Sequence, residues 1–243
     1  GGTTLGRICF GYVYPDFNAS FRYTTPSYSG TTLSVGLYDP SAIKGSTGSG
    51  AEGAITANQS DAPRIEGELN ISLAGLSEGS NLAISGMYQE AQPTALSKGG
   101  AEIEAHGIHV GGTLVGGPVA FTAHYYTGEC LGITLQMDSG AMSADGICRD
   151  HDGYYVQGTY NYGAGKIGVS WGGSYQDKAG NDGDKYDVKE KQEMYTVGIY
   201  HNAAPEWLWV AEYSHAEEDW YDKDAGDERG ESDIFSVGMF YLW

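Results

Sequence analysis

The sequence predicts an all-β protein, namely a transmembrane, antiparallel, up-and-down β-barrel. Three observations support this fold class: short segments of alternating polarity recur along the chain, short turns alternate with long polar loops, and the last stretch, Ile234–Trp243, carries an apolar or aromatic side chain at every second position. Alternate side chains of a strand point to opposite faces. A final strand with one fully apolar face, in a very acidic chain, is typical of a barrel strand that faces lipid.

The composition restricts the classes of protein to which the chain can belong. Its 243 residues include 32 acidic and 13 basic ones, for a formal net charge of −19. This charge excludes nucleic acid as a partner, because nucleic-acid sites need a basic surface. No apolar run approaches the ~18–20 residues of a membrane-spanning helix. Gly1 begins no recognisable signal peptide, so we expect a mature chain or a fragment.

The first strands are recognised by their alternation. Ala19–Thr25 alternates aromatic with polar residues, and Thr32–Tyr38 follows after a turn that contains Pro and Gly. Pro63–Leu73 is the clearest strand, since four Ile or Leu residues alternate with charged and polar ones. Such a polar face fits a water-filled interior better than a packed core, in which unpaired charges are costly.

Eight further strands bring the number to eleven. They are expected at Leu82–Glu90, Ala101–Leu114, Val119–Tyr126, Gly153–Tyr162, Lys166–Tyr175, Met194–His201, Trp207–His215 and Ile234–Trp243. In the second of these the alternation slips around Gly107, which predicts a β-bulge.

The connections alternate between short and long. Pro26–Gly30 and Val115–Pro118 are short, whereas Asp39–Ala62, Thr127–Asp152 and Ala216–Asp233 are long. Short turns on one rim and long loops on the other are typical of an outer-membrane barrel. The last loop is dense in carboxylates but lacks the residue order of a calcium loop, so we expect a solvated acidic vestibule there.

The number of strands also makes a prediction about closure. The closing strand descends to the short-turn rim, so Ala19–Thr25 also descends and needs an ascending neighbour before it. An unpaired edge in lipid is costly. We therefore expect that N-terminal strands are missing from the sequence. The alternative is that Leu5–Tyr14 is a strand and closes a smaller, twelve-stranded barrel.

Three cysteines are present. Cys130 and Cys148 bracket one polar, glycine-containing segment, so we expect a loop disulfide formed in an oxidising compartment, with a pair of unlinked thiols as the alternative. Cys9 is left over and is expected to be a small residue of the barrel wall.

Several stretches, taken in their order, resemble the Gram-negative general porins. They are Gly6-Arg7-Ile8, Tyr14-Pro15-Asp16-Phe17-Asn18-Ala19, Phe21-Arg22-Tyr23-Thr24-Thr25-Pro26, Leu33-Ser34-Val35-Gly36-Leu37-Tyr38-Asp39-Pro40, Pro63-Arg64-Ile65-Glu66, Ala211-Glu212-Tyr213-Ser214 and Phe240-Tyr241-Leu242-Trp243. The resemblance covers essentially the whole sequence. It implies a trimeric outer-membrane barrel of ~16 strands, of which this sequence would hold eleven or twelve. Residues 1–243 would form a single domain, with 1–17 as the exit of a constriction loop and 18–243 as barrel strands and loops.

The resemblance also implies a function. The protein would let ions and small hydrophilic solutes diffuse passively through a water-filled channel, without catalysis, cofactor or metal. Its partners would be two further copies in a homotrimer, outer-membrane lipid and lipopolysaccharide. The net charge favours a preference for cations.

Candidate pore residues follow from the resemblance and from the alternation. Arg7, Arg22 and Arg64 would form a basic wall that faces loop carboxylates across the constriction. Ordinary ion pairing inside the lumen, for example between Arg64 and Glu66 or Glu68, is the alternative. The carboxylates expected to make the lumen acidic nearby are Glu66, Glu68, Glu102 and Glu104.

Two other classes of function fit parts of the pattern. An outer-membrane hydrolase would use His124, but no G-x-S-x-G motif is present; a secreted acidic β-sandwich binding module is the second. His106, His109 and His124 lack the regular spacing of a zinc site. Aromatic residues near strand ends are expected to form interface girdles: Tyr12, Tyr14, Tyr154, Tyr162, Trp171, Trp207, Trp209 and Trp243.

Overall fold

The computed structural model describes residues 9–15, 17–45, 56–93, 102–138, 140–143, 146–179, 188–222 and 226–241. Its strands are β1 Ser20–Thr24, β2 Thr31–Tyr38, β3 Ile43–Lys44, β4 Thr56–Gln59, β5 Arg64–Ser72, β6 Asn81–Pro93, β7 Ile103–Gly116, β8 Val119–Glu129, β9 Asp150–Asn161, β10 Gly165–Gln176, β11 Val188–Ala204, β12 Trp207–Asp222 and β13 Gly226–Tyr241. Among the described residues, no helix has the length and apolar character needed to cross a membrane.

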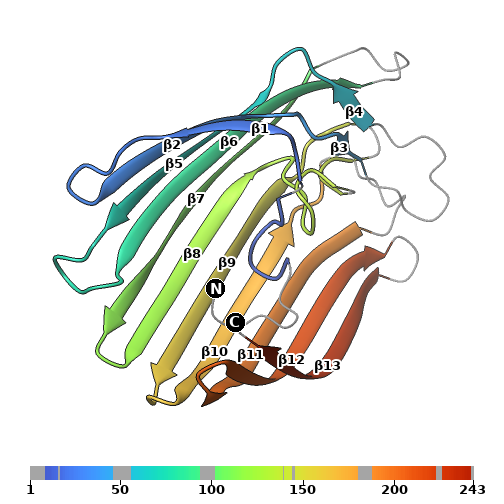
Figure 1. Ribbon diagram of the computed structural model, residues 1–243. Helices are drawn as coiled ribbons and strands as arrows, with labels where there is room; N and C mark the ends of the chain where they lie inside the picture. Colours follow the sequence, from blue (N-terminus) through green and yellow to red (C-terminus); the bar gives the residue numbers. More distant parts are fainter. Residues whose placement is uncertain are drawn as a thin grey trace.

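All strands belong to one antiparallel sheet in which each main strand pairs with the next along the chain (Figure 1). The sheet has 13 strands, and β3 and β4 lie off its main path, which leaves the eleven that the sequence predicts. Figure 1 shows the sheet curved into a trough. The predicted all-β, up-and-down fold class is confirmed. Among the described residues, no pairing joins β13 to β1.

The convex face of the sheet is apolar. Residue pairing aligns Leu33, Leu69, Ile84, Val110 and Tyr125 in one row across five neighbouring strands. Large side chains on this face are exposed, up to 86% for Val237. So much exposed apolar surface requires an apolar surrounding.

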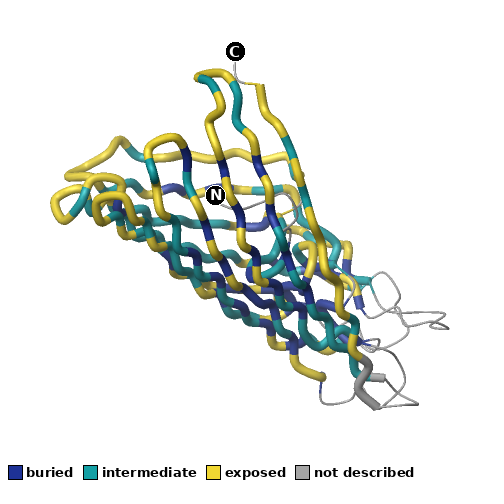
Figure 2. The backbone as a smooth tube through the Cα atoms, turned by 90° about the horizontal axis from the view of Figure 1, so that it is seen from below, coloured by how far each residue is buried: buried dark blue, intermediate teal, exposed yellow. Residues whose placement is uncertain are grey.

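The concave face is polar. Thr24, Ser34, Glu68, Ser85 and His109 form one row across β1, β2, β5, β6 and β7. Figure 2 shows buried and exposed residues alternating along the central strands. The alternation with a period of two, which predicted the strands, therefore places apolar side chains on one face of the sheet and polar side chains on the other.

A third region, the connection between β8 and β9, carries a buried apolar cluster. Residues 130–149, called here the β8–β9 loop, fold over the concave face instead of extending away from it. Nine buried residues pack together there: Ile43, Ala57, Ala91, Ile103, Ala105, Cys130, Met137, Ala141 and Met142.

This cluster explains why the predicted β-bulge at Gly107 is wrong. The pairing of β7 with β6 and with β8 runs through Gly107 without a shift. Ile103 and Ala105 are apolar although they face inward, because the β8–β9 loop covers them. The slip in the pattern marks a change in what the inner face contacts, not an extra residue.

Two other predictions about connections need correction. The segment predicted as one long loop at residues 39–62 contains the short strands β3 and β4, which pair with each other and with β6. The predicted acidic loop at 216–233 is largely strand, since β12 runs to Asp222 and β13 begins at Gly226. Three of its carboxylates, Glu217, Glu218 and Asp219, form ion pairs with basic residues of neighbouring strands.

The alternative of a strand at residues 5–14 is also wrong over its described part. Residues 9–13 form turns and irregular structure, and Tyr14 makes a single bridge with Leu135 of the β8–β9 loop. A twelve-stranded barrel closed by this segment therefore receives no support.

Candidate functional site

A cavity of about 290 Å³ lies on the concave face of the sheet. One side is formed by strands β1, β2 and β5 to β8. The other is formed by Tyr12, Val13 and Pro15 and by the β8–β9 loop, which contributes Leu131 and Gln136. The lining side chains of the strands include Arg22, Glu66, Glu68, Ser85, His109 and His124.

Arg22 and Glu68 form an ion pair across the strand between them. Arg22 Nη2 lies 3.3 Å from Glu68 Oε1, and the two side chains are 47% and 42% exposed. Arg22 lies on β1 and Glu68 on β5, so the pair has to cross β2. The residues of β2 opposite them, Gly36 and Ser34, are small enough to allow this. Because an exposed ion pair is weak, both charges remain available to a solute.

Arg64 has a different environment. Its side chain is 1% exposed, and its Nε lies 2.9 Å from Glu66 Oε1. Its Nη1 donates a hydrogen bond of 3.0 Å to Ser41 Oγ, and its guanidinium lies over the ring of Tyr38 at 5.1 Å. Arg64 is not among the residues that line the cavity. It pairs with Glu66 as the alternative interpretation expects, and Glu66 itself reaches the cavity.

Two histidines meet in the cavity wall, which sequence reasoning missed. The rings of His109 on β7 and His124 on β8 are 5.2 Å apart, and His124 also stacks on Tyr155 at 5.1 Å. His109 Nδ1 is 3.3 Å from Ser85 Oγ. Gly111 faces His124 in the pairing, and a Cβ there would lie 2.4 Å from the Cβ of His124. The two histidines are fifteen positions apart in the sequence, so only the register of β7 and β8 reveals their contact.

The other predicted carboxylates do not lie in the cavity. Glu104 faces the convex side, opposite Glu90 of β6. Glu102 precedes β7, and the nearby Glu90 carboxylate raises the pKa of the Glu102 carboxyl. The expectation that both would make the lumen acidic is wrong for Glu104. Its side chain is exposed on the outward side of β7, as is that of His106, whereas Ile103 and Ala105 face inward and are buried. Arg7 lies outside the described residues.

The expected aromatic girdles are also partly wrong. Tyr12 lines the cavity and Tyr14 pairs with Leu135, so neither lies on the convex face. Tyr154 and Trp171 contact each other on that face, with ring centroids 5.4 Å apart. Trp243 lies outside the described residues.

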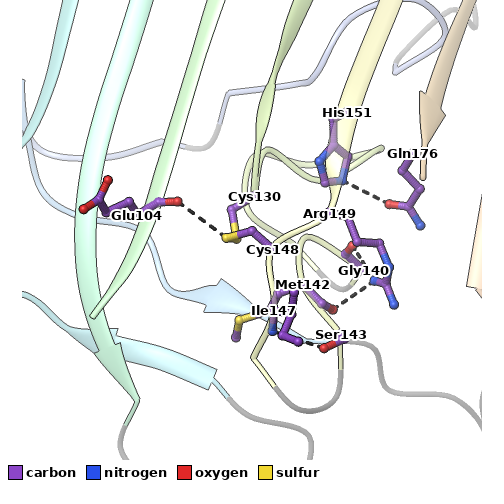
Figure 3. The surroundings of a disulfide bond; sticks show 10 residues. All are labelled: Glu104, Cys130, Gly140, Met142, Ser143, Ile147, Cys148, Arg149, His151 and Gln176. Carbon is purple, nitrogen blue, oxygen red and sulfur yellow. Dashed lines mark hydrogen bonds between the residues drawn. A yellow bond between two sulfur atoms is a disulfide. The ribbon is translucent and has the colours of Figure 1, made fainter. Parts of the chain in front are cut away.

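Cys130 and Cys148 are joined by a disulfide within the β8–β9 loop, the pairing expected from the sequence (Figure 3). Cys9 is a free cysteine that is 2% exposed, and burial raises the pKa of its thiol. Its carbonyl oxygen accepts a hydrogen bond of 3.1 Å from Ser174 Oγ of β10. Cys9 therefore belongs to a segment that packs on the inside of the wall, not to the wall itself.

No group of three or more His, Cys, Asp or Glu side chains in the described part of the chain is arranged to hold a metal ion. The cavity offers polar walls with one guanidinium, that of Arg22, and two carboxylates, those of Glu66 and Glu68. Walls of this kind can sort solutes by size and charge.

The comparisons with known proteins agree with this geometry. A family model described as Gram-negative porin matches residues 2–220. No curated protein sequence matches the chain. Among solved structures, the outer membrane channel DcaP of Acinetobacter baumannii superimposes with a TM-score of 0.71 at 15% identity, over 92% of this chain and 62% of that one.

Two further solved structures are similar at lower scores. A porin matches with a TM-score of 0.52 at 12% identity, over 93% of this chain and 62% of that one. OmpTdeltaL8, a loop L8 deletion mutant of the outer membrane protein OmpT of Vibrio cholerae, matches with a TM-score of 0.53 at 14% identity, over 92% of this chain and 62% of that one. The chain thus spans 62% of the length of each structure, and at these identities the likeness establishes the fold alone.

Proposed function

The chain belongs to the Gram-negative porin family, and we propose that it forms the wall of a water-filled channel through which ions and small hydrophilic solutes diffuse passively. Proteins of this family lie in the bacterial outer membrane, which is therefore the location of this chain. They are channels and not enzymes.

The observation that carries the proposal is the division of one sheet into two chemically opposite faces. The convex face exposes large apolar side chains such as Phe235 and Val237, at 82% and 86%. The concave face holds the Arg22–Glu68 ion pair beside an open cavity. A sheet that is apolar outside and charged inside suits a wall between lipid and water.

The structure gives less support to the two alternative functions than to a channel. A β-sandwich packs two sheets face to face, whereas all the described strands form one sheet, so that alternative is wrong. The hydrolase alternative required an activity that depends on His124. His124 instead stacks on Tyr155 and contacts His109 in the wall of the cavity.

Selectivity for cations is a further part of the proposal. Two carboxylates, Glu66 and Glu68, line the cavity beside the single guanidinium of Arg22. The net charge of −19 adds a negative potential at the channel entrances. Of the three arginines predicted for the constriction, this proposal assigns only Arg22 to its basic side.

The assembly is proposed to be a homotrimer in contact with outer-membrane lipid and lipopolysaccharide. The apolar convex face supports contact with lipid and with further copies of the chain. The expected result is a complex that migrates as a trimer in SDS without heating and as a monomer after heating. Migration as a monomer in both conditions would refute the trimer.

Channel activity is tested with protein purified from outer membranes in planar bilayers. We expect stepwise, ohmic conductance and, in a KCl gradient, a reversal potential with the sign of a cation-selective pore. Glu68→Gln should move the reversal potential toward that of a non-selective pore, because it removes an exposed negative charge from the cavity. Lack of conductance steps in the unaltered protein would refute the proposal.

A further inference from the structure

We propose that the β8–β9 loop is a fixed narrowing element of the channel, which sets the size limit for solutes. This inference rests on the proposed channel function. It assigns a role to a loop that the sequence predicted only as a long connection on one rim.

The loop is fixed by its own packing. Met137 and Met142 are fully buried against the inner face of β6 and β7, in the cluster that includes Ala91 and Ile103. The Cys130–Cys148 disulfide closes the base of the loop (Figure 3). Cys148 Sγ lies 3.5 Å from the carbonyl oxygen of Glu104 on β7. A loop with a buried apolar cluster and a cross-link cannot swing away from the wall without exposing that cluster to water.

A buried arginine holds the interior of the loop together. The side chain of Arg149 is 1% exposed, and its Nη1 donates hydrogen bonds to the carbonyl oxygens of Gly140, at 2.7 Å, and Met142, at 2.9 Å (Figure 3). Its main-chain nitrogen donates to the carbonyl oxygen of Ala141. The guanidinium thus satisfies backbone acceptors that a folded loop would otherwise bury without partners.

Contacts with distant strands fix the loop over the concave face. Gln192 on β11 donates a hydrogen bond of 2.8 Å from Nε2 to the carbonyl oxygen of Ile133. Lys44 on β3 forms an ion pair of 3.0 Å with Asp138. Strands on both sides of the trough therefore hold the loop, which crosses between them.

The side of the loop that faces the cavity carries Leu131 and Gln136, with Arg22 and Glu68 on the opposite wall. Gln136 Oε1 is buried and has no hydrogen-bond partner within the described part of the chain. Because this oxygen exposes almost no surface, a passing solute does not reach it, and the contribution of Gln136 is to the width of the cavity.

Two kinds of variant test the proposal in the channel purified from outer membranes. The Cα atoms of Cys130 and Cys148 are 4.8 Å apart, so a short Gly-Ser linker can replace residues 131–147 without moving β8 or β9. We expect this deletion to raise single-channel conductance about twofold and to admit larger neutral sugars in liposome swelling, because a wider waist conducts more.

A point substitution provides an independent test that leaves the loop folded. Gln136→Trp should lower conductance by about half, because the larger side chain fills the cavity. Leu135→Trp is the matched control, since Leu135 is the neighbouring residue but is not among those that line the cavity.

The outcomes separate the two proposals. Conductance in the unaltered protein, with the same conductance and size limit in the deletion and in Gln136→Trp, would overturn the role of the loop and leave the channel function intact. Equal effects of Gln136→Trp and Leu135→Trp would also overturn it. A complete lack of conductance in the unaltered protein would refute the channel function and the inference with it.

Discussion

The β8–β9 loop and the end of the β12–β13 hairpin are long connections at the same rim, but they have opposite structures. The loop folds inward around Met137 and Met142 and is cross-linked by a disulfide. The hairpin instead extends its two strands, so that β12 and β13 each have 16 residues. One connection is ordered by a small core, the other by strand pairing and surface charge.

The charges of the hairpin end lie next to opposite charges on neighbouring strands. Arg229 Nη2 is 2.6 Å from Glu217 Oε2 across the hairpin. Lys191 of β11 lies 3.2 Å from Asp219, and Lys189 lies 2.9 Å from Glu218. Since these groups are partly exposed, water screens each pair. The comparison teaches that buried groups fix the loop firmly, whereas exposed groups hold the hairpin only weakly.

The largest expected effect is that of Arg149→Leu. This change removes hydrogen bonds to the carbonyl oxygens of Gly140 and Met142. Hydrogen bonds to a charged group contribute about 1.5–3 kcal/mol each, so the local free energy of opening of the loop should fall by about 3–6 kcal/mol. Hydrogen exchange of the loop amides, measured by mass spectrometry, reports that quantity. Unchanged protection of residues 131–148 would contradict the role of Arg149.

The second effect is that of removing the cross-link with the double variant Cys130→Ser and Cys148→Ser. The disulfide spans a sequence separation of 18 residues. A loop of that length loses about 3 kcal/mol of stabilisation when its cross-link is removed. Limited proteolysis should then cut the loop faster, while Cys9→Ser, which leaves the disulfide intact, serves as the control. Equal cleavage rates in both variants would show that the apolar cluster alone holds the loop.

The third prediction applies the arginine substitution to the other region. Arg229→Leu removes ion pairs with Glu217 and Glu231, at 2.6 and 2.9 Å. Arg229 is exposed, so water solvates the carboxylates that lose their partner, and exchange protection of the hairpin should change far less than that of the loop in Arg149→Leu. A loss of protection as large as that in Arg149→Leu would remove the distinction between the two regions.

Much of the sheet could be predicted from the sequence, because the period of two is a local property. All eleven main strands overlap their predicted ranges, although β11, β12 and β13 extend well beyond theirs at the long-loop rim. Arg22, Glu66 and Glu68 line the cavity as their alternation suggests. Burial of Arg64 was not predictable in this way. The burial depends on two residues that contact the guanidinium. Tyr38 lies at the end of the neighbouring strand β2, and Ser41 lies in the connection that follows it.

The two long connections were misinterpreted for physical reasons that differ. In the hairpin, the density of carboxylates suggested a solvated loop, but the lysines that pair with Glu218 and Asp219 lie on β11, almost thirty residues earlier. In the β8–β9 loop, Leu131, Ile133, Met137 and Met142 were a signal of inward packing. The surroundings of Met137 and Met142 come from β3, β4, β6 and β7, so no local pattern identifies the partner.

The smallest expected effect, and the one that separates the two regions most directly, is the response to salt. At 1 M ionic strength the Debye length falls to about 3 Å, which weakens attraction between the exposed charges of the hairpin. Salt has little influence on the hydrogen bonds of Arg149, because its guanidinium is buried. Hydrogen exchange at low and high salt should therefore show faster exchange in residues 215–221 and 229–233 but not in residues 131–148. If both regions responded equally, charge would not be what distinguishes them, and strand pairing alone would have to account for the length of the hairpin.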